Sequence, residues 1–368
     1  MRQADAKGTG LLVGMIIGAG MFALPYAVLR GGLVPSIIAF FFAAFLVTSV
    51  HLLYGDVLYH NHERHRLPGY VREYMGGGWY ILAFVSRLFS YYGYLLAYGV
   101  LAGIFLAQLI PSASTNFFGT LYFIVLAPFL LLDMRRLGTL NLVLTIPLVL
   151  FVALLFLFLV PSFQFEGIPL FSSGGDWLLP YGIFLFAFSG ASAIPEIVDI
   201  FRHRDKRAFR RVVVLSSVIA ALVYLFFIMS VIGVAGGNVA EHALSSLKEF
   251  APWPLFAVGV LIGLLAITTS YFALGLELRY TFQYDLFETK IVAWFATAVV
   301  PLILYLVGIN DFVLILSIIG AVGVGVEGIL IAVLARRLIH TGRAYVALLV
   351  GLFSLGAALG CLHVLGFI

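Results

Sequence analysis

Three glycines and a proline interrupt the first long apolar stretch of the chain. Gly14, Gly18 and Gly20 lie within seven residues, and Pro25 follows five residues after the last of them. Each glycine costs about 1 kcal/mol relative to alanine inside a helix, and proline costs about 3 kcal/mol. The sequence therefore predicts a broken helix near Ile17 to Gly20, with unpaired backbone groups on both sides of the break.

These backbone groups predict a binding site for a small charged molecule. The second half of the helix begins near Gly20 with free N–H groups and the positive end of a helix dipole, which favour a carboxylate. The first half ends near Ile17 with free carbonyl groups, which favour a cation or an ammonium group. A zwitterion satisfies both ends, and no charged side chain lies at the break.

A second apolar stretch carries the same signature. The segment Gly-Ala-Ser-Ala-Ile-Pro at 190–195 aligns with Gly-Met-Phe-Ala-Leu-Pro at 20–25, with glycine, alanine and proline in register. We therefore expect a second break at Ser189, Gly190 and Ala191. Glycine and proline are frequent in ordinary membrane helices as well, but two matching breaks favour an internal repeat.

The composition requires a membrane protein built from helices. Of 368 residues, 63% are hydrophobic and 10% are charged, whereas roughly a quarter are charged in soluble domains. The segment 142–160 is apolar on nearly every helical face, which excludes the alternating pattern of a transmembrane barrel. Apolar windows of about 20 residues predict eleven spans, near 8–29, 33–56, 79–108, 117–132, 139–160, 177–198, 212–235, 254–281, 291–308, 311–335 and 344–366.

The basic residues predict the orientation of the chain in an inner (plasma) membrane. Cytoplasmic loops are enriched in Lys and Arg, and alternate loops here hold 18 of the 21 basic residues. The N-terminus is therefore expected in the cytoplasm and, after eleven spans, the C-terminus outside. The basic set comprises Arg2, Lys7, Arg64, Arg66, Arg72, Arg135, Arg136, Arg202, Arg204, Lys206, Arg207, Arg210, Arg211, Arg279, Lys290, Arg336, Arg337 and Arg343.

The two predicted breaks lie in spans one and six, which are five helices apart. An odd separation makes the two copies enter the membrane from opposite sides, as in the inverted repeats of secondary transporters. The predicted organisation is a first repeat over 1–160, a second over 161–335 and an additional span over 336–368, all within a single transporter domain.

Three motifs resemble the amino acid/polyamine/organocation (APC) superfamily and, within it, the aromatic and hydroxy amino acid permeases of the tryptophan/tyrosine type. They are Gly-Ala-Gly-Met at 18–21, Tyr-Leu-Leu-Ala-Tyr at 94–98 and Phe-Ala-Phe-Ser-Gly at 186–190. The resemblance implies an all-α polytopic membrane protein with a five-plus-five inverted-repeat (LeuT-like) fold, broken spans one and six, and an extra span eleven. It also implies cation-coupled amino acid symport by alternating access, with an aromatic or hydroxy amino acid as substrate.

The resemblance places the substrate on the backbone at the two breaks. Tyr94 or Tyr98 of span three is expected to close the pocket, although tyrosines in membrane helices also serve for packing and interfacial anchoring. The expected substrate-binding residues are Ile17, Gly18, Ala19, Gly20, Met21, Tyr94, Tyr98, Ser189, Gly190 and Ala191.

The resemblance also suggests a place for a coupling ion. Five neutral oxygen ligands suit a sodium ion, and Ser and Thr serve equally as contacts between helices, so Na⁺ and H⁺ both remain open. Met21 stands where relatives with a second sodium site have Asn, and 139–160 holds none of the lysines that replace sodium in some proton-coupled relatives. The expected sodium ligands are Gly14, Ile17, Ala266, Thr269 and Ser270.

Ionisable residues inside spans are candidates for gating or coupling. Glu196 follows Pro195 in span six, and Arg87 lies toward the cytoplasmic side of span three. We expect Arg87 to pair with Glu196 or Asp199. Two further acids nearer the inner ends of their spans, Glu277 and Glu327, are expected to reach headgroups or loop arginines.

The remaining features point away from other protein classes. The loop His60 to His65 matches no zinc spacing, and we find no catalytic triad or zinc-protease motif. Neither a transition metal nor a cofactor other than the coupling ion is expected.

The expected partners are an amino acid and the lipid bilayer, and no nucleic acid is expected. The alternative function is a nutrient sensor or a channel built on the same fold. The connection 236–254 predicts a short amphipathic helix, either a lid or an interfacial filler.

Overall fold

The protein is helical throughout the part that the structure describes. The computed structural model describes residues 3–60, 66–132, 137–164, 167–172, 174–201, 206–286 and 289–364. By length and hydropathy, eight of its helices qualify as membrane spans and a bent pair forms a ninth; two shorter apolar helices accompany them. These eleven segments coincide with the eleven predicted spans, and the all-α polytopic fold is confirmed.

The first five spans follow the predicted order. Span one is divided into α1 (Gln3–Ile16), the 3₁₀ turn η1 (Ala19–Ala23) and α2 (Leu24–Gly31), with a bend of 46°. A short helix that the sequence analysis missed, α4 (Leu67–Met75), precedes span three. Spans two to five are α3 (Leu33–His60), α5 (Gly77–Leu109), α6 (Thr115–Leu126) with η2 (Ala127–Leu131), and α7 (Leu137–Leu159).

The second half begins with the other broken span. Span six consists of η4 (Asp176–Leu178), α8 (Leu179–Phe188), η5 (Ala191–Ala193) and α9 (Ile194–Phe201). Span ten contains an unpredicted π-helical turn, η6 (Ile319–Val324), between α14 (Phe312–Ile318) and α15 (Gly325–Leu338). The other spans are α10 (Lys206–Ala235), α12 (Trp253–Asp285), α13 (Lys290–Leu306) and α16 (Arg343–Val364).

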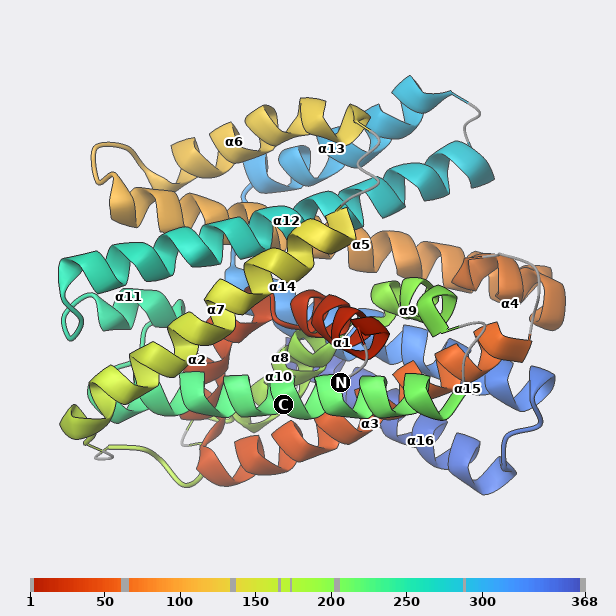
Figure 1. Ribbon diagram of the computed structural model, residues 1–368, viewed down its shortest axis with the longest axis horizontal. Coiled ribbons are helices and arrows are strands. Elements are labelled where there is room, and N and C mark those ends of the chain that lie inside the picture. Colours follow the sequence, from red (N-terminus) through yellow and green to blue (C-terminus); the bar gives the residue numbers. More distant parts are fainter. Residues whose placement is uncertain are drawn as a thin grey trace.

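The broken spans lie at the centre of the bundle. In Figure 1, α1 and α8 are surrounded by longer helices, with α6 and α13 at one edge and α16 at the other. The most apolar window of span six is 67% buried, whereas that of α16 is 22% buried. The bilayer therefore contacts α16 extensively, and the breaks are shielded from lipid.

Several basic residues of the predicted cytoplasmic set form ion pairs with acidic residues at one end of the bundle. Arg211 at the start of α10 pairs with Asp5 at the start of α1 at 2.8 Å, and Lys206 pairs with Asp56 near the end of α3 at 3.0 Å.

The sequence placed Arg279 among the basic residues of the cytoplasmic loops, and this prediction is wrong. Arg279 lies inside α12, fully buried, and donates to the Leu130 carbonyl at 2.9 Å. Arg2, Arg64, Arg135, Arg136, Arg202 and Arg204 lie outside the described residues.

A short helix, α11 (Ala243–Leu247), lies at the opposite end, within the predicted connection. It packs against α10, α12, α2 and η1, and Ser245 is hydrogen-bonded to Gln108 of α5. Burial lowers the pKa of the preceding residue, His242, so its neutral ring packs on Phe312. Because it touches η1, α11 covers the end of the bundle that leads to the first break.

Close packing of η6 on α8 depends on a glycine. A Cβ atom on Gly320 would overlap the Gly182 carbonyl group, which is backbone and cannot rotate away. We predict that Gly320→Ala lowers the free energy of unfolding by about 1–3 kcal/mol, the usual cost of overpacking. The measurement is the melting temperature of the purified protein in detergent.

Gly351→Ala is the matched control for this substitution. Gly351 lies in α16, and a Cβ there would meet nothing within 4 Å. Alanine is a better helix former than glycine by up to about 1 kcal/mol, so the control should melt at the same temperature or higher. Equal melting temperatures for the two variants would contradict the packing argument.

Candidate functional site

The first break is narrower than predicted. Helix α1 ends at Ile16, and Gly18 adopts a non-helical conformation with φ −136° and ψ −146°. The chain resumes helical turns at Ala19, where the Met21 N–H donates to the Gly18 carbonyl at 3.3 Å. Ile17 and Gly18 alone therefore form the interruption, within the predicted range of Ile17 to Gly20.

Gly20 lies just beyond the interruption and also allows the two broken spans to pack closely. It lies inside η1, and a Cβ on it would lie 2.8 Å from the Cα atom of Ala187. The absence of a side chain lets η1 approach α8 closely, so Gly20 brings the two broken spans into contact.

The second break lies where the sequence predicted it. Helix α8 ends at Phe188, Ser189 is extended with φ −64° and ψ 132°, and Gly190 precedes η5 with φ −157°. The Gly190 N–H donates to Nε2 of His51 on α3 at 3.2 Å. The Gly190 carbonyl accepts from the Ala193 N–H at 3.0 Å. Both polar groups of Gly190 are thus satisfied within the protein.

A small cavity lies between the two breaks. Its volume is about 30 Å³, whereas a cavity of about 150 Å³ binds benzene. In this conformation the cavity therefore has room for water but is too small for an amino acid. The predicted residues that line the cavity are Gly18, Ala19, Gly20, Tyr94, Tyr98 and Ser189; Met15, Ile16, Phe186, Ser192 and Leu274 were not predicted.

The remaining predicted substrate residues lie beside the cavity and do not line it. Ile17 and Met21 are buried at or next to the first break, with exposed fractions of 1% and 0%. Gly190 and Ala191 are buried at the second. The backbone of these four residues therefore forms or flanks the two breaks, while neighbouring residues line the cavity.

Tyrosine and phenylalanine rings make one wall of the cavity. The Tyr94 hydroxyl lies 3.2 Å from Ser189 Oγ, so α5 is linked to the second break. The rings of Tyr94 and Phe186 lie 5.0 Å apart between centroids, a favourable separation for an aromatic pair. An ideal Cβ on Gly18 would lie 3.6 Å from the Tyr98 hydroxyl, which places Tyr98 at the first break.

Tyr224 of α10 joins the two broken helices, and the sequence analysis missed it. Its hydroxyl lies 2.7 Å from the Ile16 carbonyl at the end of α1 and 2.7 Å from the Ala187 carbonyl near the end of α8. A tyrosine hydroxyl has one hydrogen to donate, so both helix ends compete for the same donor. The sequence offered no signal for this role, because Tyr224 is one of several aromatic residues in an apolar span.

The predicted ion ligands lie on the expected elements, α1 and α12, at or near the first break. Ser270 Oγ is buried beside the Tyr98 hydroxyl, but no described residue is placed with the distance and angles of a hydrogen bond to it. An ideal Cβ on Gly18 would lie 3.8 Å from it, so Ser270 faces the first break. Thr269 Oγ1 donates to the Ala266 carbonyl at 2.9 Å, and Gly14 is buried on α1 one turn before the break.

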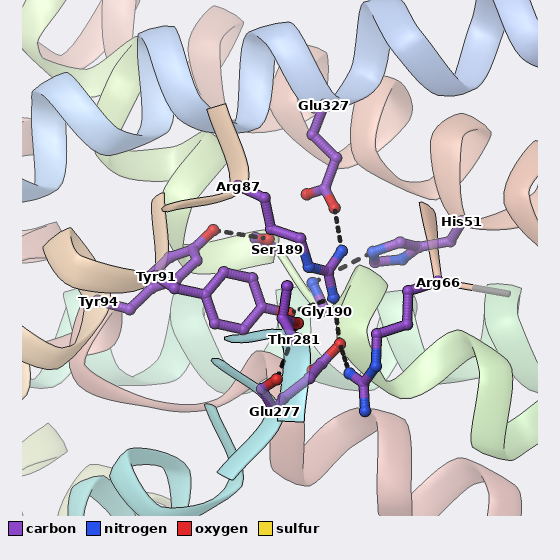
Figure 2. A network of polar contacts seen from close by, with 10 residues as sticks. All are labelled: His51, Arg66, Arg87, Tyr91, Tyr94, Ser189, Gly190, Glu277, Thr281 and Glu327. Atoms are coloured by element: carbon purple, nitrogen blue, oxygen red, sulfur yellow. Dashed lines mark hydrogen bonds and ion pairs between the residues drawn. The ribbon is translucent and has the colours of Figure 1, made fainter. Parts of the chain in front are cut away.

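Arg87 forms an ion network different from the predicted one. Its guanidinium is bonded to Glu277 of α12, donates to the Tyr91 hydroxyl at 2.8 Å and lies 4.0 Å from Glu327 of α15 (Figure 2). Arg66, which precedes α4, pairs with the same Glu277 carboxylate at 2.9 Å. The expected pairing with Glu196 or Asp199 is therefore wrong, because Arg87 is turned toward α12 and α15.

Glu196 takes no part in that network. It lies on α9 with an exposed side chain, in the electrostatic surroundings of Lys7, Arg66, Asp199 and Glu277. The prediction that Glu277 reaches a loop arginine is confirmed by Arg66. Residues 61–65 of the histidine loop lie outside the described residues.

Comparison with known proteins identifies the family. The model of the tryptophan/tyrosine permease family matches residues 2–357, so the chain belongs to this family. Glutamine transporter 2 of Aliivibrio fischeri is 21% identical over 329 residues, covering 85% of this chain and 83% of the relative.

A solved structure shares the fold. It is Mhp1, a nucleobase-cation-symport-1 family transporter in a closed conformation with bromovinylhydantoin bound. The TM-score is 0.63 at 14% sequence identity, over 89% of this chain and 77% of that one. The likeness confirms the LeuT-like arrangement with broken spans one and six.

The shared donor predicts a stability effect of Tyr224→Phe. Without the hydroxyl, the Ile16 and Ala187 carbonyls lose their common donor inside the bundle, and an unsatisfied buried polar group costs about 1–3 kcal/mol. The variant should melt below the wild type in detergent. Tyr345→Phe, which removes a hydroxyl from an exposed position on α16, is the control and should not change the melting temperature. Equal melting temperatures for both variants would contradict this role.

Proposed function

We propose that the protein is a secondary active amino acid transporter that moves its substrate together with a cation by alternating access. The observation that carries this proposal is the cavity between two broken helices, which is lined by Gly18, Gly20 and Ser189 but by no charged side chain. Backbone carbonyls at the end of α1 suit an ammonium group, and N–H groups at the start of η1 suit a carboxylate. A free amino acid carries both groups.

The wall of the cavity supports an aromatic or hydroxy amino acid as substrate. Tyr94, Tyr98 and Phe186 offer ring faces for an aromatic side chain, and Ser189 offers a hydroxyl group. The family description supports the same class. The relative named as a glutamine transporter makes glutamine a necessary member of any substrate panel.

Two layers of ion pairs supply the gates that alternating access requires. At one end, Arg87 joins α5 to α12 and α15 through Glu277 and Glu327. At the other end, Arg30 of α2 pairs with Asp176 of η4 at 2.8 Å, beyond the cavity. Rearrangement of one layer at a time would open the cavity to one side. Glu196 on α9 is exposed toward the first of these ends and would act there.

We propose the orientation and repeat organisation that the sequence predicts. Basic residues gathered at the Arg87 end favour a cytoplasmic position for that end and for the N-terminus, in an inner membrane. The C-terminus would then lie outside. The halves 1–160 and 161–335 would act as the two repeats, with 336–368 as an addition.

Uptake into proteoliposomes tests the proposed function. The purified protein is reconstituted, sodium and pH gradients are imposed separately, and labelled Trp, Tyr, Phe, Ser, Thr and Gln are supplied in turn. We expect at least one amino acid to accumulate above its external concentration under one of the two gradients. Binding without transport would indicate a sensor, and gradient-independent equilibration would indicate a channel; either result would contradict the proposal.

Span eight gives the second functional test. If a sodium ion binds between the end of α1 and Ser270, at the ligands that the sequence predicts, Ser270→Ala and Thr269→Ala each remove one oxygen ligand and should raise the sodium concentration needed for half-maximal uptake by about tenfold or more. Thr268→Ala is the control, because Thr268 is not among the expected ligands and its Oγ1 contacts α6, where it accepts from the Tyr122 hydroxyl. Unchanged sodium dependence in both ligand variants would exclude a sodium site at this position.

A further inference from the structure

A buried histidine that the proposed function does not use contacts the second break. His51 of α3 is 1% exposed, and its Nε2 accepts from the Gly190 N–H at 3.2 Å (Figure 2). To accept this bond, Nε2 must carry no proton, so the ring is neutral with its hydrogen on Nδ1. Nδ1 is itself buried without a hydrogen-bond partner in the described part of the chain. A titratable group thus holds the backbone of the break.

A proton on Nε2 would remove this contact. Both nitrogen atoms of an imidazolium are donors, so Nε2–H and the Gly190 N–H would face each other as two donors without an acceptor. A buried N–H that loses its acceptor is unfavourable, and so is a buried charge without a partner. Protonation of His51 therefore disfavours this closed conformation and releases the Gly190 segment.

Other charged groups do not neutralise this effect. The helix α3 packs against α2, η4, η5, α8, α9, α10 and α15, and Gly190 is also covered by α1. Among the described ionisable residues of these elements, none forms a hydrogen bond or ion pair with His51. They are Tyr54, Asp56, Tyr59 and His60 on α3; Asp5 and Lys7 on α1; Tyr26 and Arg30 on α2; Asp176 on η4; Tyr181 on α8; Glu196 and Asp199 on α9; Lys206, Arg207, Arg210, Arg211 and Tyr224 on α10; and Glu327, Arg336 and Arg337 on α15.

Helix α1 controls the access of water to His51. An ideal Cβ on Gly190 would lie 2.9 Å from Ile16 Cγ1, 3.1 Å from Leu12 Cδ1 and 3.5 Å from His51 Cε1. The end of α1 therefore covers the contact between Gly190 and the imidazole. A movement of α1 away from η5 would uncover the ring, and proton exchange would be limited to that open state.

We propose that His51 is the proton-binding site that couples amino acid transport to the pH gradient, acting through the Gly190 N–H. This inference rests on the proposed function and selects protons from the two coupling ions left open there. A proton alone opens the break and prevents the closed state. A substrate carboxylate bound at the start of η1 lies in the cavity that Ser189 also lines, and its negative charge offsets the cost of the buried imidazolium without direct contact, so the proton and the substrate favour each other's binding.

His51→Gln separates coupling from binding. The Gln side-chain oxygen can accept from the Gly190 N–H, but it does not titrate. In proteoliposomes with the amino acid found in the panel, an inward gradient of one pH unit should drive accumulation of up to about tenfold in the wild type, because one pH unit is a tenfold ratio of proton concentration. His51→Gln should lose this accumulation while retaining exchange of labelled for unlabelled substrate at equal pH. His60→Gln, at the exposed end of the same helix, should behave as the wild type.

A second measurement does not depend on the variant. Substrate binding to the purified wild-type protein in weakly buffered solution near neutral pH should be accompanied by proton uptake. Binding without proton uptake would overturn the proposal, and so would a His51→Gln protein that still accumulates substrate under the pH gradient or that loses exchange while it remains folded. Accumulation driven by sodium alone would overturn it while the proposed function stands, and absence of any amino acid uptake would overturn the proposed function itself.

Discussion

Backbone N–H and C=O groups released by a broken helix have no water to bond in the hydrocarbon core, so each must find a partner within the protein. Two helices of this bundle are broken at its centre, and both breaks face one small cavity. The surrounding helices supply the missing partners. The Tyr224 hydroxyl offers one hydrogen that the carbonyls at the end of α1 and near the end of α8 share, and His51 accepts from the N–H of Gly190. The breaks are stable because intact helices on either side provide side chains for them.

These partners give the two breaks different chemical properties. The carbonyls beside Tyr224 share a single donor, so an additional donor such as an ammonium group would find an acceptor there. The N–H of Gly190 depends on an imidazole that can change from acceptor to donor. Carbonyls of both broken helices could thus accept from a cationic ligand, the second break also responds to protonation, and Gly20 holds η1 and α8 in contact. In the proposed mechanism, coupling between substrate and proton would follow from this shared geometry.

The sequence predicted those features that depend on local composition. Glycine and proline spacing located both breaks to within two residues, and apolar windows located all eleven segments. The partners of the breaks could not be predicted, because His51 lies 139 positions from Gly190 and is bonded to backbone that carries no residue signature. The prediction of the partner of Arg87 was wrong for a related reason. Four acids (Glu196, Asp199, Glu277 and Glu327) lie near the same membrane depth as Arg87. The rotation of α5 about its axis selects among them, and packing determines that rotation.

We hold that backbone groups at the first break bind both charged ends of an amino acid: carbonyls at the end of α1 accept from the ammonium group, and N–H groups at the start of η1 donate to the carboxylate. Equilibrium binding to the purified protein tests this claim, with the best substrate compared with its decarboxylated amine and its deaminated acid. Each analogue is expected to lose most of the affinity, because each leaves one of these two sets of backbone groups without a partner. Equal affinity for the amine or the acid, with the side chain unchanged, would show that the corresponding backbone groups are not part of the site and would contradict this claim.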